Sequence, residues 1–366
     1  MKMKKKKIRN IFLNSVENSS IFRLTINPTL DCNFRCWYCY ETHKKNTKIS
    51  NKNISLIKKL INNILDKFDT IEIAFFGGEP LLEFYNIILP LIKYTSEISN
   101  NKNKNYYITF TTNGYLINDE IIGKLKQYNI GLSQITLDGG EYTHNRTRIS
   151  KDGNSFIRII NNIKKFTDAN LPVLIRINVT KDNIIYSNDL ISHLSKFSEH
   201  QKNNITISIQ QVWQDIKNDI FDEILELYKK LDKIGYRIYP IKRDYIRSIC
   251  YADKRYSAVI NWDGRVFKCT ALDFESTKED GVLSSDGNLK IDNQFDIRLN
   301  TRFNNKLCKN CRILPLCNGG CSKNIDLSKG KEYCLYPTQK DKDRIIKSII
   351  KEKLVLNNLR NRVDVN

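Results

Sequence analysis

The sequence predicts an α/β fold with a parallel sheet, followed by a smaller cysteine-rich domain. Apolar runs typical of strands alternate with segments of helical period from residue 20 to about residue 235, which is the pattern of successive βα units. Three of the ten cysteines lie between residues 32 and 39, and the other seven follow residue 249. At 366 residues the chain is long enough for one large domain and one smaller domain.

Six βα units are expected in the first part of the chain. Their strands are expected at Phe22–Ile26, Thr70–Phe76, Tyr106–Thr111, Leu132–Leu137, Val173–Val179 and Ile205–Val212. Their helices are expected at Ile54–Lys67, Leu82–Thr95, Asp119–Gln127, Ser155–Phe166, Asn188–Phe197 and Ile220–Ile234. Because crossovers between parallel strands are right-handed, the carboxyl ends of the strands meet at one edge, where sites in such sheets form.

The net charge of +20 leaves three explanations open. The lysines are spread along the whole chain and mixed with asparagine and isoleucine, so solvated faces explain most of them. An acidic peptide steered in by the basic surface is the next alternative. Nucleic acid is the least favoured partner, because no RNA-binding module or basic–aromatic repeat is evident.

No segment of the sequence predicts a membrane span or a secretory signal. The apolar run Ile87–Ile92 is far short of the roughly 20 residues that a spanning helix needs. Residues Met1–Arg9 are basic, and no apolar stretch follows them. We therefore expect a cytoplasmic protein without a membrane partner, and in a reducing cytosol ten cysteines argue for metal sites rather than disulfides.

The first group of cysteines lies in the segment Cys32-Asn33-Phe34-Arg35-Cys36-Trp37-Tyr38-Cys39. Three thiols are too few for a closed tetrahedral zinc site, but they can hold a [4Fe–4S] cluster that leaves one iron without a protein ligand. The alternative is three free cysteines. It is disfavoured because reactive thiols are usually few and scattered in a cytosolic chain.

At this spacing the segment resembles the signature loop of the radical S-adenosylmethionine (SAM) enzymes, in which an aromatic residue, here Tyr38, precedes the third cysteine. The resemblance implies a partial (β/α)6 barrel and a [4Fe–4S] cluster held by Cys32, Cys36 and Cys39. It further implies that the fourth iron binds SAM and that reduction cleaves SAM to a 5′-deoxyadenosyl radical, which removes a hydrogen atom from a C–H bond. The electron would come from a donor such as flavodoxin or ferredoxin.

A second motif follows the second predicted strand, in the turn Phe76-Gly77-Gly78-Glu79-Pro80. In the family this Gly-Gly-Glu-Pro turn holds the amino group of SAM, so the resemblance implies a cofactor-binding role for Gly77, Gly78, Glu79 and Pro80. Taken alone, the motif would be an ordinary strand-to-helix turn. Its place at a strand end, downstream of the cysteine loop, supports the resemblance.

Further contacts to SAM are expected from Tyr38 and from Asn113, Thr136 and Arg176. Asn113 and Thr136 lie in segments that resemble family segments lining the SAM pocket, although Asn-Gly and Asp-Gly turns explain both segments without a ligand. Arg176 lies in a strand that otherwise looks buried and needs a partner, either the SAM carboxylate or a barrel carboxylate such as Glu79. Residues 144–148 are expected to form a basic loop, with His144 in a turn or at the surface.

The other seven cysteines reproduce the pattern of the SPASM domain, an extension found in a subset of radical SAM enzymes. The resemblance implies one auxiliary [4Fe–4S] cluster on Cys308, Cys311, Cys317 and Cys334. It implies another on Cys250, Cys269 and Cys321, one of whose irons lacks a protein thiolate, so that three clusters are expected in all. A zinc site on Cys308, Cys311, Cys317 and Cys321 is the alternative, but it leaves Cys250 and Cys269 unexplained.

Two further elements are expected in this second part. Residues Val259–Lys268 predict a hairpin with an Asp263-Gly264 turn, which would bring Cys269 against Cys250. Residues Asp341–Leu359 predict a charged amphipathic helix. The expected ranges are therefore 1–19 for a basic extension, 20–235 for the barrel, 236–337 for the SPASM domain and 338–366 for a C-terminal helix.

The combined resemblance implies a radical SAM/SPASM oxidoreductase that acts on a peptide or protein, as maturases do when they form thioether or carbon crosslinks in ribosomally made peptides. Formylglycine formation in a sulfatase is one alternative, but those enzymes carry an aspartate directly after the second cysteine of this domain, where Thr270 stands here. Asp273 is the nearest carboxylate and the single candidate for a catalytic residue. Radical modification of RNA or of a small molecule remains a further alternative.

The way in which a leader peptide would be bound is a separate question. Only about twenty residues precede the first predicted strand, too few for a leader-recognition domain. The leader would then be held by the barrel itself, for instance along an exposed sheet edge, or by a separate leader-binding protein.

Overall fold

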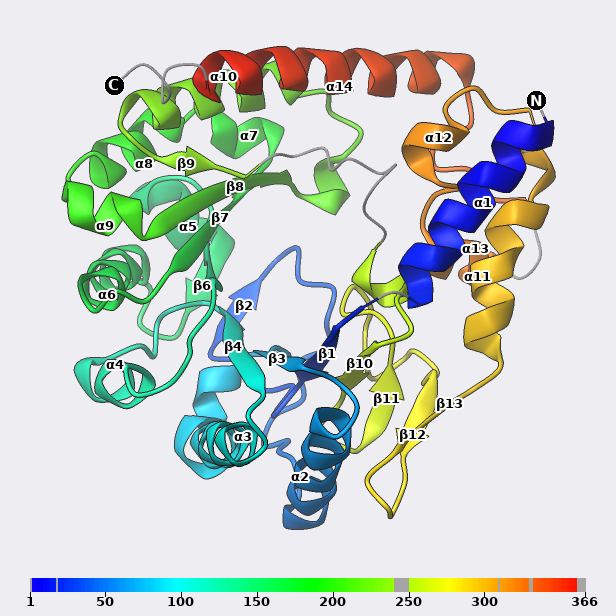
Figure 1. The fold of residues 1–366 in the computed structure, drawn as a ribbon. Helices are drawn as coiled ribbons and strands as arrows, with labels where there is room; N and C mark the ends of the chain where they lie inside the picture. The colour runs from blue at the N-terminus through cyan, green and yellow to red at the C-terminus, as the bar shows by residue number, and fades with distance from the viewer. Residues whose placement is uncertain (1, 18, 240–249, 309, 329–331, 361–366) are drawn as a thin grey trace.

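One curved sheet organises the described part of the chain, which comprises residues 2–17, 19–239, 250–308, 310–328 and 332–360 of a computed structural model (Figure 1). Parts of the expected domain ranges, notably residues 240–249 and 361–366, lie outside the described residues. The strand order is β13-β12-β11-β10-β1-β3-β4-β5-β7-β8-β9, and the strands from β10 to β9 run parallel. The parallel strands are β1 (Ile21–Ile26), β3 (Thr70–Phe75), β4 (Asn105–Thr112), β5 (Ser133–Leu137), β7 (Val173–Val179), β8 (Ile205–Gln211), β9 (Arg237–Ile238) and β10 (Ser257–Ile260).

Helices lie on the outer side of this sheet (Figure 1). Several begin at side chains that cap free backbone N–H groups: Ser50 accepts a hydrogen bond from the backbone of Asn53, and Asn118 accepts one from Ile121. The α-helices between the parallel strands β1 to β9 are α2 (Asn51–Leu65), α3 (Leu89–Asn101), α4 (Asp119–Leu125), α5 (Glu141–Thr147), α6 (Phe156–Asp168), α7 (Lys181–Ile184), α8 (Ser187–Leu194), α9 (Glu199–Asn203) and α10 (Phe221–Lys233). The longer helices, such as α2, α6 and α10, turn an apolar stripe toward the strands, as a helix must in order to join a common core.

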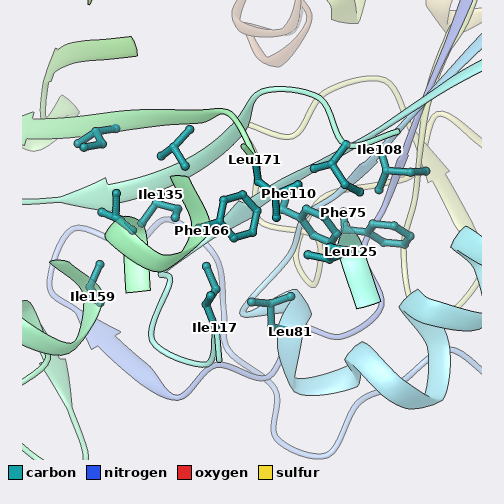
Figure 2. Packing of buried hydrophobic residues seen from close by; sticks show 14 of the residues in the cluster. Phe75, Leu81, Ile108, Phe110, Ile117, Leu125, Ile135, Ile159, Phe166 and Leu171 are labelled. Carbon is teal, nitrogen blue, oxygen red and sulfur yellow. The ribbon is translucent and has the colours of Figure 1, made fainter. Parts of the chain in front are cut away.

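The main core fills the space between these helices and the sheet. Figure 2 shows Phe75, Phe110 and Ile135 of three neighbouring strands packed against Leu125 of α4 and Phe166 of α6. All five side chains are buried. The site-bearing ends of the strands therefore rest on a closely packed base.

The expected elements of the first part are confirmed, and every strand boundary lies within one residue of its predicted position. The predicted helix Leu82–Thr95 is wrong at its start. A short 3-10 turn, η1 (Pro80–Glu83), and a π-helical turn, η2 (Phe84–Ile88), precede α3 there. Pro90 lies in the first turn of α3, where its missing N–H is tolerated, whereas inside a longer helix it would clash with the preceding turn.

The cysteine-rich part continues the same sheet. Strand β10 pairs parallel with β1, with Ile260 beside Ile26, and β11 (Arg265–Phe267), β12 (Gly281–Leu283) and β13 (Leu289–Ile291) follow in antiparallel order. The predicted hairpin is confirmed, because Val259 pairs with Phe267 across β10 and β11. The remaining helices of this part are η4 (Tyr251–Asp253), α11 (Gln294–Asn304), η5 (Lys306–Cys308), α12 (Leu314–Cys317) and α13 (Ser322–Leu327). The expected domain boundaries stay a prediction.

The two ends of the described chain form helices that pack on the rest. Helix α1 (Lys2–Glu17), expected only as a basic extension, buries Phe12 and Val16 against Phe295 and Leu299, two residues of α11. Helix α14 (Gln339–Arg360) matches the predicted C-terminal helix and lies over α10 (Figure 1). Among the described residues, no helix has the length and apolar character needed to cross a bilayer.

Candidate functional site

A small second sheet fixes the cysteine loop. Strand β2 (Phe34–Cys36) pairs antiparallel with β6 (Arg148–Ser150), so that Cys36 stands directly opposite Arg148. After β2 the chain turns, and the Cys39 N–H donates to the Cys36 carbonyl oxygen at 3.1 Å. The second and third cysteines of the loop are thus held by backbone contacts.

The three thiols of the loop lie within range of one another's charge. Burial raises the pKa of Cys32 to about 12, and the negative charges of Glu79 and Cys36 add to this rise. Burial likewise raises the pKa of Cys39 to about 11, with a contribution from Cys36. Among the described residues, no three Cys, His, Asp or Glu side chains converge tightly enough to hold a single metal ion. Three neighbouring thiols that lack a fourth ligand fit a [4Fe–4S] cluster, which would bind them as thiolates and release their protons.

The Gly-Gly-Glu-Pro turn packs against the backbone that leads into this loop. Gly77 has a φ of +104°, and a Cβ there would stand 2.5 Å from the Thr29 carbonyl oxygen. A Cβ at Gly78 would stand 2.2 Å from the carbonyl oxygen of Asp31. Both positions require glycine because two backbone segments meet there without room for a side chain.

Glu79 is fully buried and joins the tips of two strands. Its carboxylate accepts hydrogen bonds from the Thr112 hydroxyl at 2.7 Å, from the Asn113 N–H at 2.8 Å and from the Leu81 N–H at 3.0 Å. Burial raises the pKa of Glu79, although these hydrogen bonds oppose the rise. The structure thus accounts for Glu79 as a support of the site, and its expected bond to the SAM amino group stays a prediction.

The other expected SAM contacts come together at the same end of the sheet. Asn113 donates to the side-chain oxygen of Asn33, inside the cysteine loop, at 2.7 Å. Thr136 on β5 is buried and lies beside Arg176 in the pairing of β5 with β7. The binding roles of these residues, and of Tyr38 and the Gly-Gly-Glu-Pro turn, are not tested by the structure and remain predictions.

A buried polar network lies behind Tyr38. The Tyr38 hydroxyl donates to Asp138 Oδ2 at 2.5 Å and accepts from Arg148 Nη1 at 2.8 Å and from Asn178 Nδ2 at 3.0 Å. Arg176 donates to Asn178 at 2.8 Å, and the carboxylate whose charge acts on it is Asp138. The barrel carboxylate that acts on Arg176 is therefore Asp138 rather than Glu79, whose hydrogen bonds are made with Thr112, Asn113 and Leu81.

The expected basic loop at residues 144–148 is also wrong. Residues Glu141–Thr147 form helix α5, and Arg148 opens β6. His144, expected in a turn or at the surface, is fully buried, packs edge-on against Phe156 and accepts a hydrogen bond from the Asp138 N–H at its Nδ1. Burial lowers its pKa well below the usual value, so the ring is neutral.

The seven later cysteines fall into two groups. Burial raises the pKa of Cys250 to about 11, and the charges of Cys269 and Cys321 contribute. Burial also raises the pKa of Cys308 to about 11, and there the contributing thiols are Cys317, Cys334 and Cys311. The charge of Cys321 thus acts on Cys250 and Cys269 and is not among the charges that act on Cys308, while the cluster ligand sets that the resemblance implies stay a prediction.

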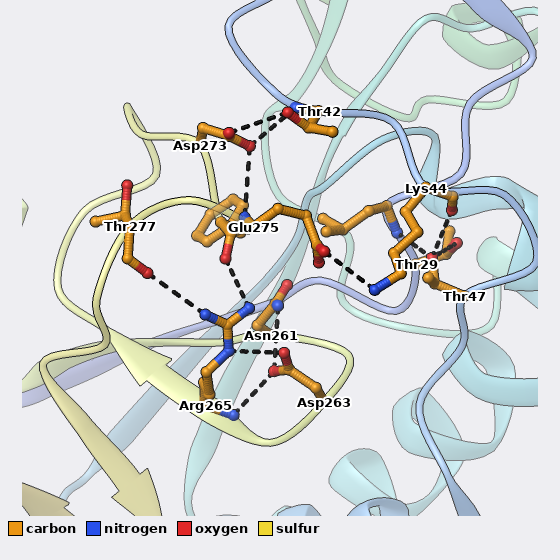
Figure 3. Close-up of polar contacts among 12 residues, drawn as sticks. Thr29, Thr42, Lys44, Thr47, Asn261, Asp263, Arg265, Asp273, Glu275 and Thr277 are labelled. Atoms are coloured by element: carbon orange, nitrogen blue, oxygen red, sulfur yellow. Dashed lines mark hydrogen bonds and ion pairs between the residues drawn. The ribbon is translucent and has the colours of Figure 1, made fainter.

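Asp273 ties the second part to the cysteine loop (Figure 3). Its carboxylate accepts hydrogen bonds from the N–H and the hydroxyl of Thr42, at 2.9 and 3.0 Å, and from the Ser276 hydroxyl at 2.7 Å. Burial would raise the pKa of Asp273, but these hydrogen bonds hold it below its usual value. A carboxylate stabilised in this way is a weak base. Its hydrogen bonds instead connect Thr42 to the segment that follows Cys269.

Three site residues escaped the sequence analysis: Glu41, Asp138 and Arg148. Glu41 is buried two residues after Cys39, and burial together with the charge of Asp273 raises its pKa to about 8. Asp138 follows β5 directly, and a carboxylate at the carboxyl end of a parallel strand is a pattern that could have identified it as a site residue. For Arg148 the sequence carries no such signal, since its position depends on pairing with β2.

Comparison with known proteins gives one family match and several similar chains. The profile of the radical SAM superfamily matches residues 26–186. A cysteine-type anaerobic sulfatase-maturating enzyme of Clostridium novyi is 25% identical over 334 residues, which cover 80% of this chain and 86% of the relative.

The solved structures with a similar fold include two that contain a bound peptide. One, described as native anSMEcpe with bound AdoMet and Cp18Cys peptide, has a TM-score of 0.69 at 18% identity and covers 93% of this chain and 99% of its own. The other, Streptococcus suis SuiB bound to precursor peptide SuiA, has a TM-score of 0.59 at 19% identity and covers 90% of this chain and 77% of its own.

Proposed function

We propose that this chain, a radical SAM enzyme whose residues 26–186 match the superfamily profile, modifies a peptide or protein. The specific substrate that we propose is a ribosomally made peptide. A [4Fe–4S] cluster and SAM would together supply the 5′-deoxyadenosyl radical that takes a hydrogen atom from the substrate. In this proposal Cys32, Cys36 and Cys39 hold that cluster. The proposed SAM contacts are Tyr38, Gly77, Gly78, Glu79, Pro80, Asn113, Thr136 and Arg176.

The observation that carries the proposal is the grouping of all ten cysteines. None of them forms a disulfide, and their mutual charge effects divide them into sets of three, three and four thiols. These are the sets that one SAM-binding cluster and two auxiliary clusters would need. The cluster on Cys250, Cys269 and Cys321 would then have an iron free to bind water or a substrate group.

A peptide substrate is supported by the surface next to the cysteine loop. Tyr40, directly after Cys39, stacks on Trp213 of η3 (Trp213–Asp215) with ring centroids 5.3 Å apart, and both rings are partly exposed. Trp37 is 56% exposed on the same loop. Exposed aromatic rings in such a place suit the side chains of a bound peptide, and two of the structures with this fold hold peptides.

Formylglycine formation is the nearest alternative, because one relative is a sulfatase-maturating enzyme. Two observations favour a peptide maturase instead. Thr270 stands where that branch carries its aspartate, and its hydroxyl is hydrogen-bonded to Tyr251 at 2.6 Å. The nearest carboxylate, Asp273, is engaged by Thr42 and Ser276. Modification of RNA or of a small molecule has no comparable structural support.

Anaerobic reconstitution followed by incubation with SAM and dithionite tests the proposal. We expect 5′-deoxyadenosine to be released by the wild type and by Cys334→Ala, but not by Cys36→Ala, because Cys334 belongs to an auxiliary group. Candidate precursor peptides from neighbouring genes, a sulfatase peptide and an RNA pool are then offered in turn. Mass change in a precursor peptide supports the proposal, whereas change in the sulfatase peptide or the RNA alone would establish the alternative.

A further inference from the structure

The positively charged side chain of Arg148 is buried directly against the cysteine loop. Arg148 faces Cys36 across the pairing of β2 with β6, and only 8% of its surface is exposed. Its guanidinium lies over the Phe34 ring, 5.6 Å from the centroid. The charge is therefore held on the protein side of the loop, away from water.

The neighbours of Arg148 only partly balance this charge. Its Nη1 donates to the Tyr38 hydroxyl at 2.8 Å and lies 3.9 Å from Asp138 Oδ2. Its Nε is buried and has no hydrogen-bond partner among the described residues. Asp138 is fully buried, and its Oδ1 likewise has no partner within the described part of the chain. Two opposite charges thus stand close to Cys36 in a region of low dielectric, where their fields are strong.

Both charged groups lie next to the loop: Arg148 faces Cys36 across the pairing of β2 with β6, and Asp138 Oδ2 lies 3.9 Å from Arg148 Nη1. A charge that stabilises a thiolate also stabilises an electron added to a cluster bound by that thiolate. Net charge, hydrogen bonds to sulfur and burial are the general determinants of iron–sulfur reduction potentials.

We propose that Arg148 and Asp138 are positioning residues that set the reduction potential of the cluster held by Cys32, Cys36 and Cys39. Arg148 raises the potential by stabilising the reduced cluster, and its buried Nε–H has no partner among the described residues. Asp138 lowers the potential and, through Tyr38, keeps the guanidinium in place. The step is the uptake of one electron from a donor of the flavodoxin or ferredoxin class, and no bond forms or breaks. The inference rests on the proposed function only in requiring a cluster at this loop.

A redox titration followed by electron paramagnetic resonance tests this inference without measuring activity. The signal that changes when SAM is added identifies the cluster of the cysteine loop. Arg148→Met removes the buried charge while keeping a long side chain. Arg146→Met is the matched control, because it removes the same charge only two residues before Arg148. The side chain of Arg146 is exposed and stacks on Tyr142. Asp138→Asn removes the opposing charge and retains an oxygen for the Tyr38 hydroxyl.

We expect Arg148→Met to lower the ratio of reduced to oxidised cluster at a fixed potential at least tenfold, a shift of about 59 mV for a one-electron couple. Arg146→Met should leave the ratio within about twofold of wild type because solvent screens exposed charges, and Asp138→Asn should raise it. Equal potentials for Arg148→Met and Arg146→Met would overturn the inference. If Arg148→Met binds no cluster, the absence of an upward shift in Asp138→Asn overturns it. A wild-type protein without a SAM-responsive cluster would instead contradict the proposed function.

Discussion

At the scale of single residues, Gly78 packs against the backbone of Leu30 and Asp31, which leads into Cys32. Gly78→Ala should displace the cysteine loop, since its Cβ would fall 2.2 Å from the Asp31 carbonyl oxygen and 2.6 Å from that of Leu30. Gly123→Ala in α4 is the control, because its Cβ would meet no described atom outside its own helix within 4 Å. Alanine there should stabilise the protein by about 0.5–1 kcal/mol. Thermal unfolding and iron content distinguish the two variants, and a Gly78→Ala protein with unchanged values would refute the close contact.

His144 predicts how stability depends on pH. Its ring is neutral in the folded protein because burial lowers its pKa, whereas an unfolded histidine has a pKa of about 6.5. Below that value the unfolded chain binds a proton that the folded chain does not bind, so the free energy of unfolding falls as the pH falls. His144→Asn should therefore show a shallower loss of stability between about pH 7 and pH 5 than the wild type.

Urea unfolding at several pH values checks this prediction. His200→Asn is the control, because His200 is exposed at the start of α9 and makes no comparable buried contact among the described residues. It should follow the wild-type slope. A slope for His144→Asn that equals the wild-type slope would show that the buried ring does not resist protonation.

Sequence reasoning found the residues that carry a local pattern and missed those defined by distant contacts. The spacing of the first three thiols marked them as metal ligands, and the resemblance to the radical SAM family added the Gly-Gly-Glu-Pro turn. Arg148 and His144 were misplaced, because a segment in which Asn145 and Arg146 follow the histidine looks solvated in sequence. Only packing against Phe156 and pairing with β2 make the two residues part of the interior.

At the scale of elements, the link between the cysteine loop and the second part depends on Asp273. Asp273→Ala removes the acceptor for two donors of Thr42 and one of Ser276, and should destabilise the protein by about 1–3 kcal/mol. Glu275→Gln is the control, since it removes only the exposed ion pair with Lys44 at 3.0 Å and should cost below about 1 kcal/mol. Denaturant unfolding measures both values. If both variants lowered the free energy of unfolding equally, Asp273 would not be the main connection between the cysteine loop and the second part.

Long elements were predictable and short ones were not. The apolar face of α6 and the buried run of β7 extend over enough residues to show their period. Strands β2 and β6 have three residues each, too few for any period, and they exist because they pair with one another. The π-helical turn η2 likewise has no signature beyond the proline that follows it.

At the scale of the whole molecule, one sheet runs through both the predicted barrel and the predicted cysteine-rich part. Strand β10 lies against β1 with all four of its residues buried, so the edge of the barrel is covered by the part that carries the seven later cysteines. The pairing joins residues more than 200 positions apart, and no local pattern can reveal it. Its consequence is that the loop with Cys32 and the hairpin before Cys269 are built on adjacent strands.

The account as a whole depends on three iron–sulfur clusters, held by the three groups of cysteines. Quantification of iron and acid-labile sulfide in protein purified and reconstituted without oxygen tests this most directly. The account predicts about twelve of each per wild-type chain and about eight after Cys32, Cys36 and Cys39 are all replaced by alanine. Protein that contains zinc, or that holds the same amount of iron with and without those three thiols, would contradict it.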